Sequence, residues 1–431
     1  MQTVPQQFFN AEGQSLPMSS DWWSSFGDST LTNLIETSLK HNLSLNVAQS
    51  NIEIAQASLA RQQLETSYST ASNLNVNLSR AAAPNRNVTA TAGGGLGASW
   101  EYDAFNRIAS AIKASEFDVE AAEQAKRDVA VIVSSETALA YVDLRGAQER
   151  LQVIRKNAET QAQSLALLNE LLDNGLATAL DVNRAEAQYR TTLAQLPSFQ
   201  ATIDSALSRL AVLTGQPASQ PADTLAQISK EGRPIPALSS AIAIGSPADL
   251  IRRRPDIRAA ETDISRRLAL GDVERARLFP TLSFGVDISA LFGGGNRLDQ
   301  LSSFSFGLGP ALRWDGPDLR RVRADIDIAD AETERAYKLY EQTVLQALSD
   351  VEIALANLVS ERQRLSNLER AVTSARDAAA LAQLRFDEGL DDFLDVLDAQ
   401  RTLLEAEDRL AQNELQTTRL AILTYRELGG T

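Results

Sequence analysis

Four short segments of the chain alternate apolar with small or polar residues at every second position. They lie at about 72–80, 94–102, 281–290 and 303–314. In the third segment the apolar positions are Leu282, Phe284, Val286 and Ile288. This period predicts β-strands that have one apolar face. Each segment has roughly the 9–11 residues that a tilted membrane strand needs.

Three observations favour membrane strands over a soluble sheet with one buried face, which is the alternative for any single segment. The segments come in two similar pairs. Aromatic residues stand at strand ends, where the girdle of a membrane barrel would lie: Trp100, Tyr102 and Trp314. The connections 80–93 and 291–302 are rich in Gly and Asn and longer than a hairpin needs, like loops that face the exterior.

Four strands cannot close a barrel, and an open sheet edge is not tolerated in lipid. A membrane barrel built from these strands would therefore be shared between copies of the chain. Two copies would supply eight strands and three would supply twelve, and both numbers remain open from the pattern alone.

Apolar residues at helical spacing cover most of the remaining chain. The predicted helical segments are about 31–66, 107–173, 178–213, 247–278, 318–387 and 392–428. In the fifth segment Val344, Leu348, Val351, Leu355 and Leu358 step by four and three residues, which is the heptad pattern of coiled packing. At ~1.5 Å per residue, a helix of about 70 residues is a rod of roughly 100 Å, too long for a compact globule.

The chain is an internal duplication. Asn174-Gly175-Leu176 and Leu180-Asp181-Val182 recur 214 positions later as Glu388-Gly389-Leu390 and Leu394-Asp395-Val396. Because this offset is nearly constant along the chain, we expect two tandem copies. The expected organisation is an N-terminal segment at 1–30, repeat 1 at 31–215, a connector at 216–246 and repeat 2 at 247–431.

Composition narrows the function further. The chain has 431 residues, a formal charge of −15, one histidine and no cysteine. The acidic balance argues against nucleic acid as a partner. Since no nucleophile–base pair, metal cluster or cofactor loop is present, an enzyme is the weakest interpretation. No window has ~20 consecutive apolar residues, and the first residues lack the regions of a signal peptide.

Several motifs together resemble one known family. They are Leu250-Ile251-Arg252-Arg253-Arg254-Pro255-Asp256-Ile257, Asp21-Trp22-Trp23 with Phe26-Gly27-Asp28, Leu397-Asp398-Ala399-Gln400-Arg401 and the terminal Leu428-Gly429-Gly430. The chain resembles the TolC-like outer membrane factors, above all the OprM-like outer membrane lipoproteins of multidrug efflux systems. The resemblance covers nearly the whole chain.

The resemblance implies a TolC-like fold that is mainly α with a β-barrel. A homotrimer would form a 12-stranded barrel in outer membrane lipid, with four strands per protomer, and a long α-helical barrel across the periplasm. An equatorial belt would come from the N-terminal segment, the connector and the C-terminus. Such proteins are exit ducts that receive substrates from a periplasmic adaptor and an inner-membrane RND pump. No cofactor is implied, and the lipidated N-terminal cysteine of this branch is absent from the chain.

The resemblance also assigns a gate to the start of the last helix. The expected gate residues are Leu394, Asp395, Asp398 and Arg401. Asp395 and Asp398 lie about one helical turn apart, and in a trimer each would form a ring of three carboxylates. Such rings favour cations and can bind a metal ion, although none is required. The alternative for Asp395 is a helix-capping role, because it stands three residues after Asp392.

The two helical hairpin tips are expected to dock on the adaptor. The residues concerned are Asn174, Gly175, Leu176, Glu388, Gly389 and Leu390. Glycine permits the positive φ that reverses the chain between two helices. The alternative is a plain helix–helix turn. Repeat 1 has Arg184 where repeat 2 has Asp398, so its hairpin is not expected to duplicate the gate.

Two alternatives to an efflux duct remain at this point. One is an outer-membrane duct of the same fold that serves a type I protein secretion system. The other is a soluble coiled-coil scaffold or adaptor, which would be monodisperse without detergent.

Overall fold

A computed structural model describes residue 8 and residues 21–80, 88–218, 225, 228, 232–238, 242, 244–294 and 297–430. The chain divides into two compact units. The helical unit comprises Met1–Ala48, Lys126–Pro255 and Val344–Thr431, and the sheet unit comprises Gln49–Ala125 and Asp256–Thr343.

The helices are η1 (Trp22–Phe26), α1 (Ser29–His41), α2 (Leu43–Gln63), η2 (Leu64–Thr66), α3 (Arg107–Asp173), α4 (Ala179–Leu193), α5 (Leu196–Leu213), α7 (Pro247–Arg253), α8 (Pro255–Ala276), α9 (Arg320–Asp387) and α10 (Phe393–Glu427). The two long helices, α3 and α9, have nearly the predicted bounds. Within the described ranges, no helix is both long and apolar enough to cross a membrane.

Three predicted helices are each divided in two. The segment 31–66 breaks at Asn42, whose side chain donates to the carbonyl of Leu213 at 2.9 Å and accepts from the amide of Ser44 at 2.9 Å. The segment 247–278 breaks before Pro255, because proline lacks the amide hydrogen that would continue the helix. The segment 178–213 breaks at 194–195, just before Pro197 in the first turn of α5.

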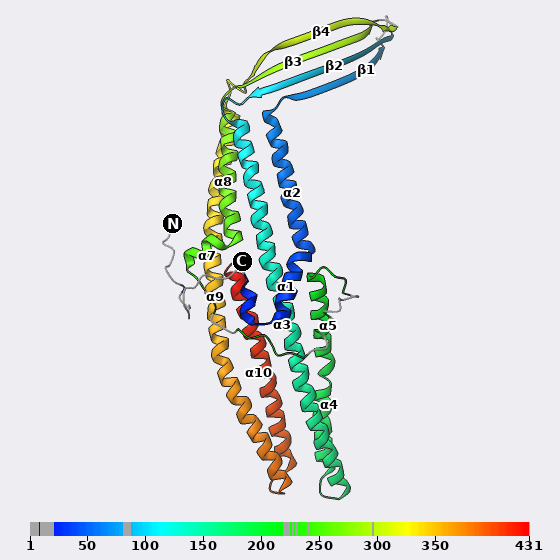
Figure 1. Cartoon of the computed structure of the whole chain (residues 1–431), viewed down its shortest axis with the longest axis vertical. Helices are drawn as coiled ribbons and strands as arrows, with labels where there is room; N and C mark the ends of the chain where they lie inside the picture. The colour runs from blue at the N-terminus through cyan, green and yellow to red at the C-terminus, as the bar shows by residue number, and fades with distance from the viewer. Residues whose placement is uncertain are drawn as a thin grey trace. The chain divides into compact units, whose positions relative to one another are not determined.

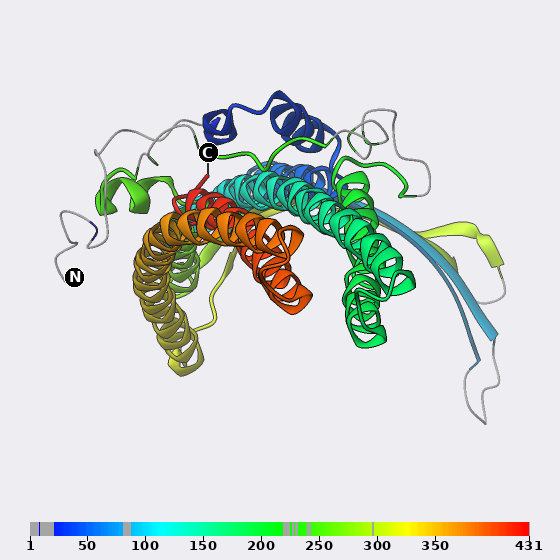
Figure 2. The ribbon, with the colours of Figure 1, turned by 90° about the horizontal axis from the view of Figure 1, so that it is seen from below.

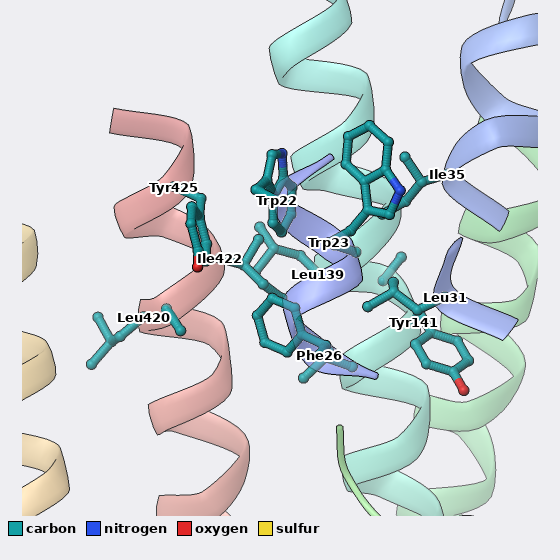
Figure 3. Close-up of a cluster of buried hydrophobic side chains, with 14 of the residues drawn as sticks. Trp22, Trp23, Phe26, Leu31, Ile35, Leu139, Tyr141, Leu420, Ile422 and Tyr425 are labelled. Atoms are coloured by element: carbon teal, nitrogen blue, oxygen red, sulfur yellow. The ribbon is translucent and has the colours of Figure 1, made fainter. Parts of the chain in front are cut away.

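The larger core of the helical unit joins the two ends of the chain. Trp22, Trp23 and Phe26 of η1 are buried, and the ring of Trp22 stacks on Tyr425 of α10 with centroids 5.2 Å apart. Figure 3 shows these rings beside Leu139 of α3. Described connector residues 225, 228, 242 and 244 belong to the same cluster. Burial of these apolar surfaces fixes η1, α3 and α10 together.

Asp28, Tyr141 and Arg145 form a hydrogen-bonded network beside this core. Asp28 begins α1 by accepting hydrogen bonds from Thr30 and Leu31, and its second oxygen accepts one from the hydroxyl of Tyr141 at 2.7 Å. The Nε of Arg145, which is fully buried, donates to the same hydroxyl at 3.1 Å. Burial and the hydrogen bond to Asp28 raise the pKa of Tyr141 to about 12.

Helix α10 is held to both long helices by polar side chains. Arg150 of α3 pairs with Asp408 at 2.7 Å, and Glu407 accepts from Asn157 of α3 at 3.2 Å and from Arg376 of α9 at 3.0 Å. Figure 2 shows α10 beside α9, and α4 beside the C-terminal part of α3. The helical unit therefore contains two helical hairpins that contact each other.

The sheet unit contains four antiparallel strands in chain order (Figure 1). They are β1 (Ser69–Arg80), β2 (Val88–Tyr102), β3 (Thr281–Gly294) and β4 (Arg297–Arg313). The strands extend beyond the alternating segments, so the bounds expected for the loops at 80–93 and 291–302 are wrong: residues 88–93, 291–294 and 297–302 belong to strands. The remaining parts of these connections, 81–87 and 295–296, lie outside the described residues. Gly93 and Gly95, typical of turns, lie inside β2, where their missing side chains make room for Asn75 and Asn73 of β1.

The register places all the alternating apolar residues on one face. Leu96 pairs with Ile288, which pairs with Phe306, and Trp100 pairs with Phe284. The other face carries Asn, Ser, Thr and Gly for most of its length. On the apolar face Leu74, Phe306 and Leu308 are each more than 60% exposed. The single chain thus leaves an apolar sheet surface uncovered.

Candidate functional site

The two tryptophans at the strand ends make equivalent contacts. Trp100 Nε1 donates to the carbonyl of Thr66 at 3.0 Å, and Trp314 Nε1 donates to the carbonyl of Leu278 at 3.1 Å. Each carbonyl precedes the first strand of its own hairpin. Tyr102 lies beside Trp100, with ring centroids 6.0 Å apart. Each tryptophan has an exposed apolar ring and a hydrogen-bonded polar atom, which is typical of aromatic side chains at a membrane–water interface.

Both hairpin tips have the same backbone. Gly175 has φ of 72° and Gly389 has φ of 71°. At the first tip the amide of Leu176 donates to the carbonyl of Leu171, five residues back, at 2.8 Å, and at the second the amide of Leu390 donates likewise at 2.9 Å. These are Schellman turns, in which glycine at the positive-φ position avoids a steric penalty. Leu176 and Leu390 follow the glycines and are 76% and 67% exposed.

The tips differ in how the returning helix begins. At the first tip Thr178 and Asp181 form a capping box, in which each side chain bonds to the backbone of the other. At the second tip the N-cap is Asp392, and its side chain accepts no capping hydrogen bond. The capping box expected as the alternative role of Asp395 is therefore not formed.

An ion pair is confined to the second tip. The guanidinium of Arg385 donates through Nη2 to Asp391 Oδ1 at 2.7 Å and through Nε to Oδ2. This hydrogen bonding lowers the pKa of Asp391. The matching positions of repeat 1 hold Leu171 and Ala177. Our sequence reasoning missed this pair, which could have been found by comparing the charges of the two repeats.

The predicted gate residues share one exposed face of α10. Leu394 is 50% exposed, Asp395 and Asp398 are exposed, and Arg401 Nη2 lies 2.6 Å from Asp398 Oδ1. The opposite face carries Phe393 and Val396, which are buried in a small core with Leu168 of α3 and Ala185 of α4. Packing of that core therefore directs the acidic face of α10 away from both hairpins.

No group of three or more His, Cys, Asp or Glu residues suited to a metal ion occurs in the described parts of the chain. Asp395 and Asp398 would need equivalents from other copies to surround a cation.

A family model described as outer membrane efflux protein matches residues 34–216 and again residues 247–429. The chain belongs to the outer membrane efflux protein family. Members of this family are outer membrane channels for efflux and not enzymes. The alternative of a soluble coiled-coil scaffold or adaptor is wrong, because the chain is an outer membrane protein.

Curated relatives agree with this membership. Outer membrane protein OprJ of Pseudomonas aeruginosa is 30% identical over 423 residues, which cover 95% of this chain and 86% of the relative. Nodulation protein T of Rhizobium leguminosarum bv. trifolii is 30% identical over 400 residues, covering 91% and 83%. The toluene efflux pump outer membrane protein TtgI of Pseudomonas putida is 27% identical over 412 residues, covering 94% and 86%.

Solved structures show the same fold. The outer-membrane channel OprN matches with a TM-score of 0.87 and 33% identity, covering 100% of this chain and 97% of that one. The open state of the Neisseria gonorrhoeae MtrE outer membrane channel matches with a TM-score of 0.83 and 23% identity, covering 99% and 95%. The family resemblance and the TolC-like fold expected from the sequence are thus confirmed.

Proposed function

We propose that three copies of the chain form the exit duct of a tripartite efflux system, which passively conducts small molecules from a periplasmic adaptor and an inner-membrane RND pump to the exterior. One observation carries the proposal. The sheet has open edges at β1 and β4 and an uncovered apolar face, so in lipid its edges need strands from other copies. Three copies would supply twelve strands.

The apolar face of the sheet would contact lipid, and the polar face would line the lumen. Trp100, Tyr102 and Trp314 would form the interfacial girdle. The N-terminal residues 1–30, the connector 216–246 and the C-terminus would form the equatorial belt, with repeats at 31–215 and 247–431. This placement is supported by the shared core of η1, α10 and the described connector residues.

The hairpin tips would dock on the adaptor. Both display an exposed leucine after the glycine, Leu176 and Leu390, and Leu180 in the first turn of α4 is 56% exposed. Apolar side chains at a protruding polar turn favour burial against a partner. A photo-cross-linking residue at Leu176 or Leu390 should capture the adaptor, while one at the exposed Gln200 of α5 should not. Equal capture from all three positions, or capture only of a type I secretion adaptor, would contradict this part.

The acidic face of α10 would form the periplasmic gate. In a trimer Asp395 and Asp398 would give two rings of three carboxylates close to the hydrophobic ring of Leu394. Arg401, which pairs with Asp398 in the same helix, would limit the repulsion within that ring. Acidic rings of this kind favour cations and are blocked by tightly bound ones.

The gate is tested by the variant with Asp395→Ala and Asp398→Ala in planar bilayers. We expect a higher single-channel conductance and loss of block by divalent cations. The matched control is Asp181→Ala with Arg184→Ala, the same positions in repeat 1. It removes the capping box of α4 but should leave conductance unchanged. If conductance and cation block are unchanged in the first variant, Asp395 and Asp398 are not the gate.

A further inference from the structure

One carboxylate stands alone in the middle of the polar face of the sheet. Asp287 of β3 pairs across the sheet with Gly97 of β2 and with Gly307 of β4. The β1 residue in the same row, paired with Gly97, is Ala71. Asp287 is therefore the one polar side chain in a row otherwise made of glycine and alanine.

The glycine beside Asp287 has a steric role. A Cβ placed on Gly307 would clash with the carboxylate of Asp287. Two neighbouring contacts are alike, since a Cβ on Gly95 would lie 2.7 Å from Asn73 Oδ1 and one on Gly93 would lie 2.9 Å from Asn75 Oδ1. Polar side chains thus lie along the sheet over glycines instead of standing out from it. The carboxylate of Asp287 therefore lies over Gly307, against the surface of the sheet.

Other charges on the polar face lie at strand ends or are neutralised. Glu101, at the end of β2, receives two hydrogen bonds from Arg107 Nη2 at 3.0 Å. Arg313, at the end of β4, pairs with Thr281, six residues before Asp287 on β3, which is about 20 Å along a strand. Asp287 has no ion pair with a described residue. Among the described carboxylates of this face, Asp287 is the one without an ion pair.

We propose that Asp287 determines the charge selectivity of the barrel segment of the channel. The inference rests on the proposed trimer, in which three copies of Asp287 form a ring of fixed negative charge in the wide lumen. The ring raises the local concentration of cations and cationic substrates and lowers that of anions. It acts as a field along the wall and not as a binding site, because each carboxylate is held apart over its own glycine.

Salt concentration distinguishes such a field from direct contact. The Debye length is about 30 Å at 0.01 M and about 3 Å at 1 M ionic strength. At low salt the field of a wall charge extends well into a wide lumen, and at high salt it is confined to the wall. The influence of Asp287 on selectivity should therefore be large at low salt and nearly vanish at 1 M.

The test is the zero-current potential of single channels in a KCl gradient. All channels carry Asp395→Asn and Asp398→Asn, so that gate carboxylates do not contribute. Against this parent, Asp287→Asn should lower the cation-to-anion permeability ratio by about twofold or more at 0.01–0.1 M salt. Ser289→Asn, which changes the next residue on the same face without changing charge, should match the parent, and Ser289→Asp should raise the ratio.

The same recordings distinguish a wrong role for Asp287 from a wrong proposal that the chain forms a duct. If the parent forms channels and Asp287→Asn has the same permeability ratio at every salt concentration, Asp287 does not set selectivity. If the parent forms no channel, the proposed function itself is wrong. Should Asp287→Asn fail to insert, Asp287→Cys offers a second test, because the chain has no other cysteine. An anionic thiol reagent should raise cation preference and a cationic one should reverse it; equal effects would overturn the proposal.

Discussion

Phe393 anchors the acidic face of α10, and its truncation should loosen that face. The side chain is 5% exposed and packs edge-on against Phe386 of α9, with centroids 5.1 Å apart. It shares a small core with Leu168, Ala185 and Val396. Phe→Ala at such a site costs about 3–5 kcal/mol. Because this core is separate from the larger one, the loss falls on the hairpin tips and not on the whole chain.

Hydrogen exchange measures this loss directly. At about 1.4 kcal/mol per tenfold change, Phe393→Ala should speed exchange of amides at 390–400 by about two to three and a half orders of magnitude. Leu384→Ala truncates a 56% exposed side chain on the same hairpin and should change the exchange rate at 390–400 by less than about threefold. Amides of α10 near Tyr425 should keep their protection in both. Exchange at 390–400 that is equal in the two variants would refute the anchoring role of Phe393.

Two further predictions concern the helical unit. Tyr141→Phe removes a hydroxyl bonded to Asp28 and should lower stability by about 1.5–3 kcal/mol in thermal unfolding at pH 7. The pKa of folded Tyr141 is raised from 10 to about 12, so its contribution to folding stability is complete below pH 10 and is lost between pH 10 and 12. The wild-type protein should therefore lose stability over this pH range, and Tyr141→Phe should not show this loss. At the tips, Thr178→Ala should lower local stability by about 1 kcal/mol because it breaks the capping box with Asp181. Asp392→Ala should lower it by almost nothing, because Asp392 makes no capping hydrogen bond. Equal rates of amide hydrogen exchange at the two tips in these variants would contradict the difference.

The main elements of the fold could be predicted because the hydrophobic pattern of each element extends over many residues and occurs in both repeats. Period-two runs and heptad steps identified the four strands and the two long helices. The lengths of the strands were underestimated because glycine close to Asn or Ser indicates a turn when the neighbouring strand is not known. In the sheet, Gly95 is required by Asn73 on the neighbouring strand. Such a contact depends on the register between strands, which the chain alone does not specify.

The candidate gate was found by resemblance, and the structure adds its physical setting. The sequence could not decide between capping and gating for Asp395, because both need a carboxylate near the start of a helix. The side-chain geometry removes capping, since Asp392 makes no capping bond. The pair of Arg385 and Asp391 was missed because its members lie on either side of a turn, where spacing rules for helices do not apply. The gating role itself stays a prediction.

Cysteine accessibility tests the orientation of the sheet in the membrane, with its apolar face toward lipid and its polar face toward the lumen. Adjacent residues of β3 point to opposite faces, and the chain has no native cysteine. A membrane-impermeant thiol reagent applied to outer membranes should label Ser289→Cys and should label Ile288→Cys only after denaturation. Labelling of Ile288→Cys in intact membranes, with Ser289→Cys protected, would contradict a lipid-facing apolar surface and a water-filled polar lumen.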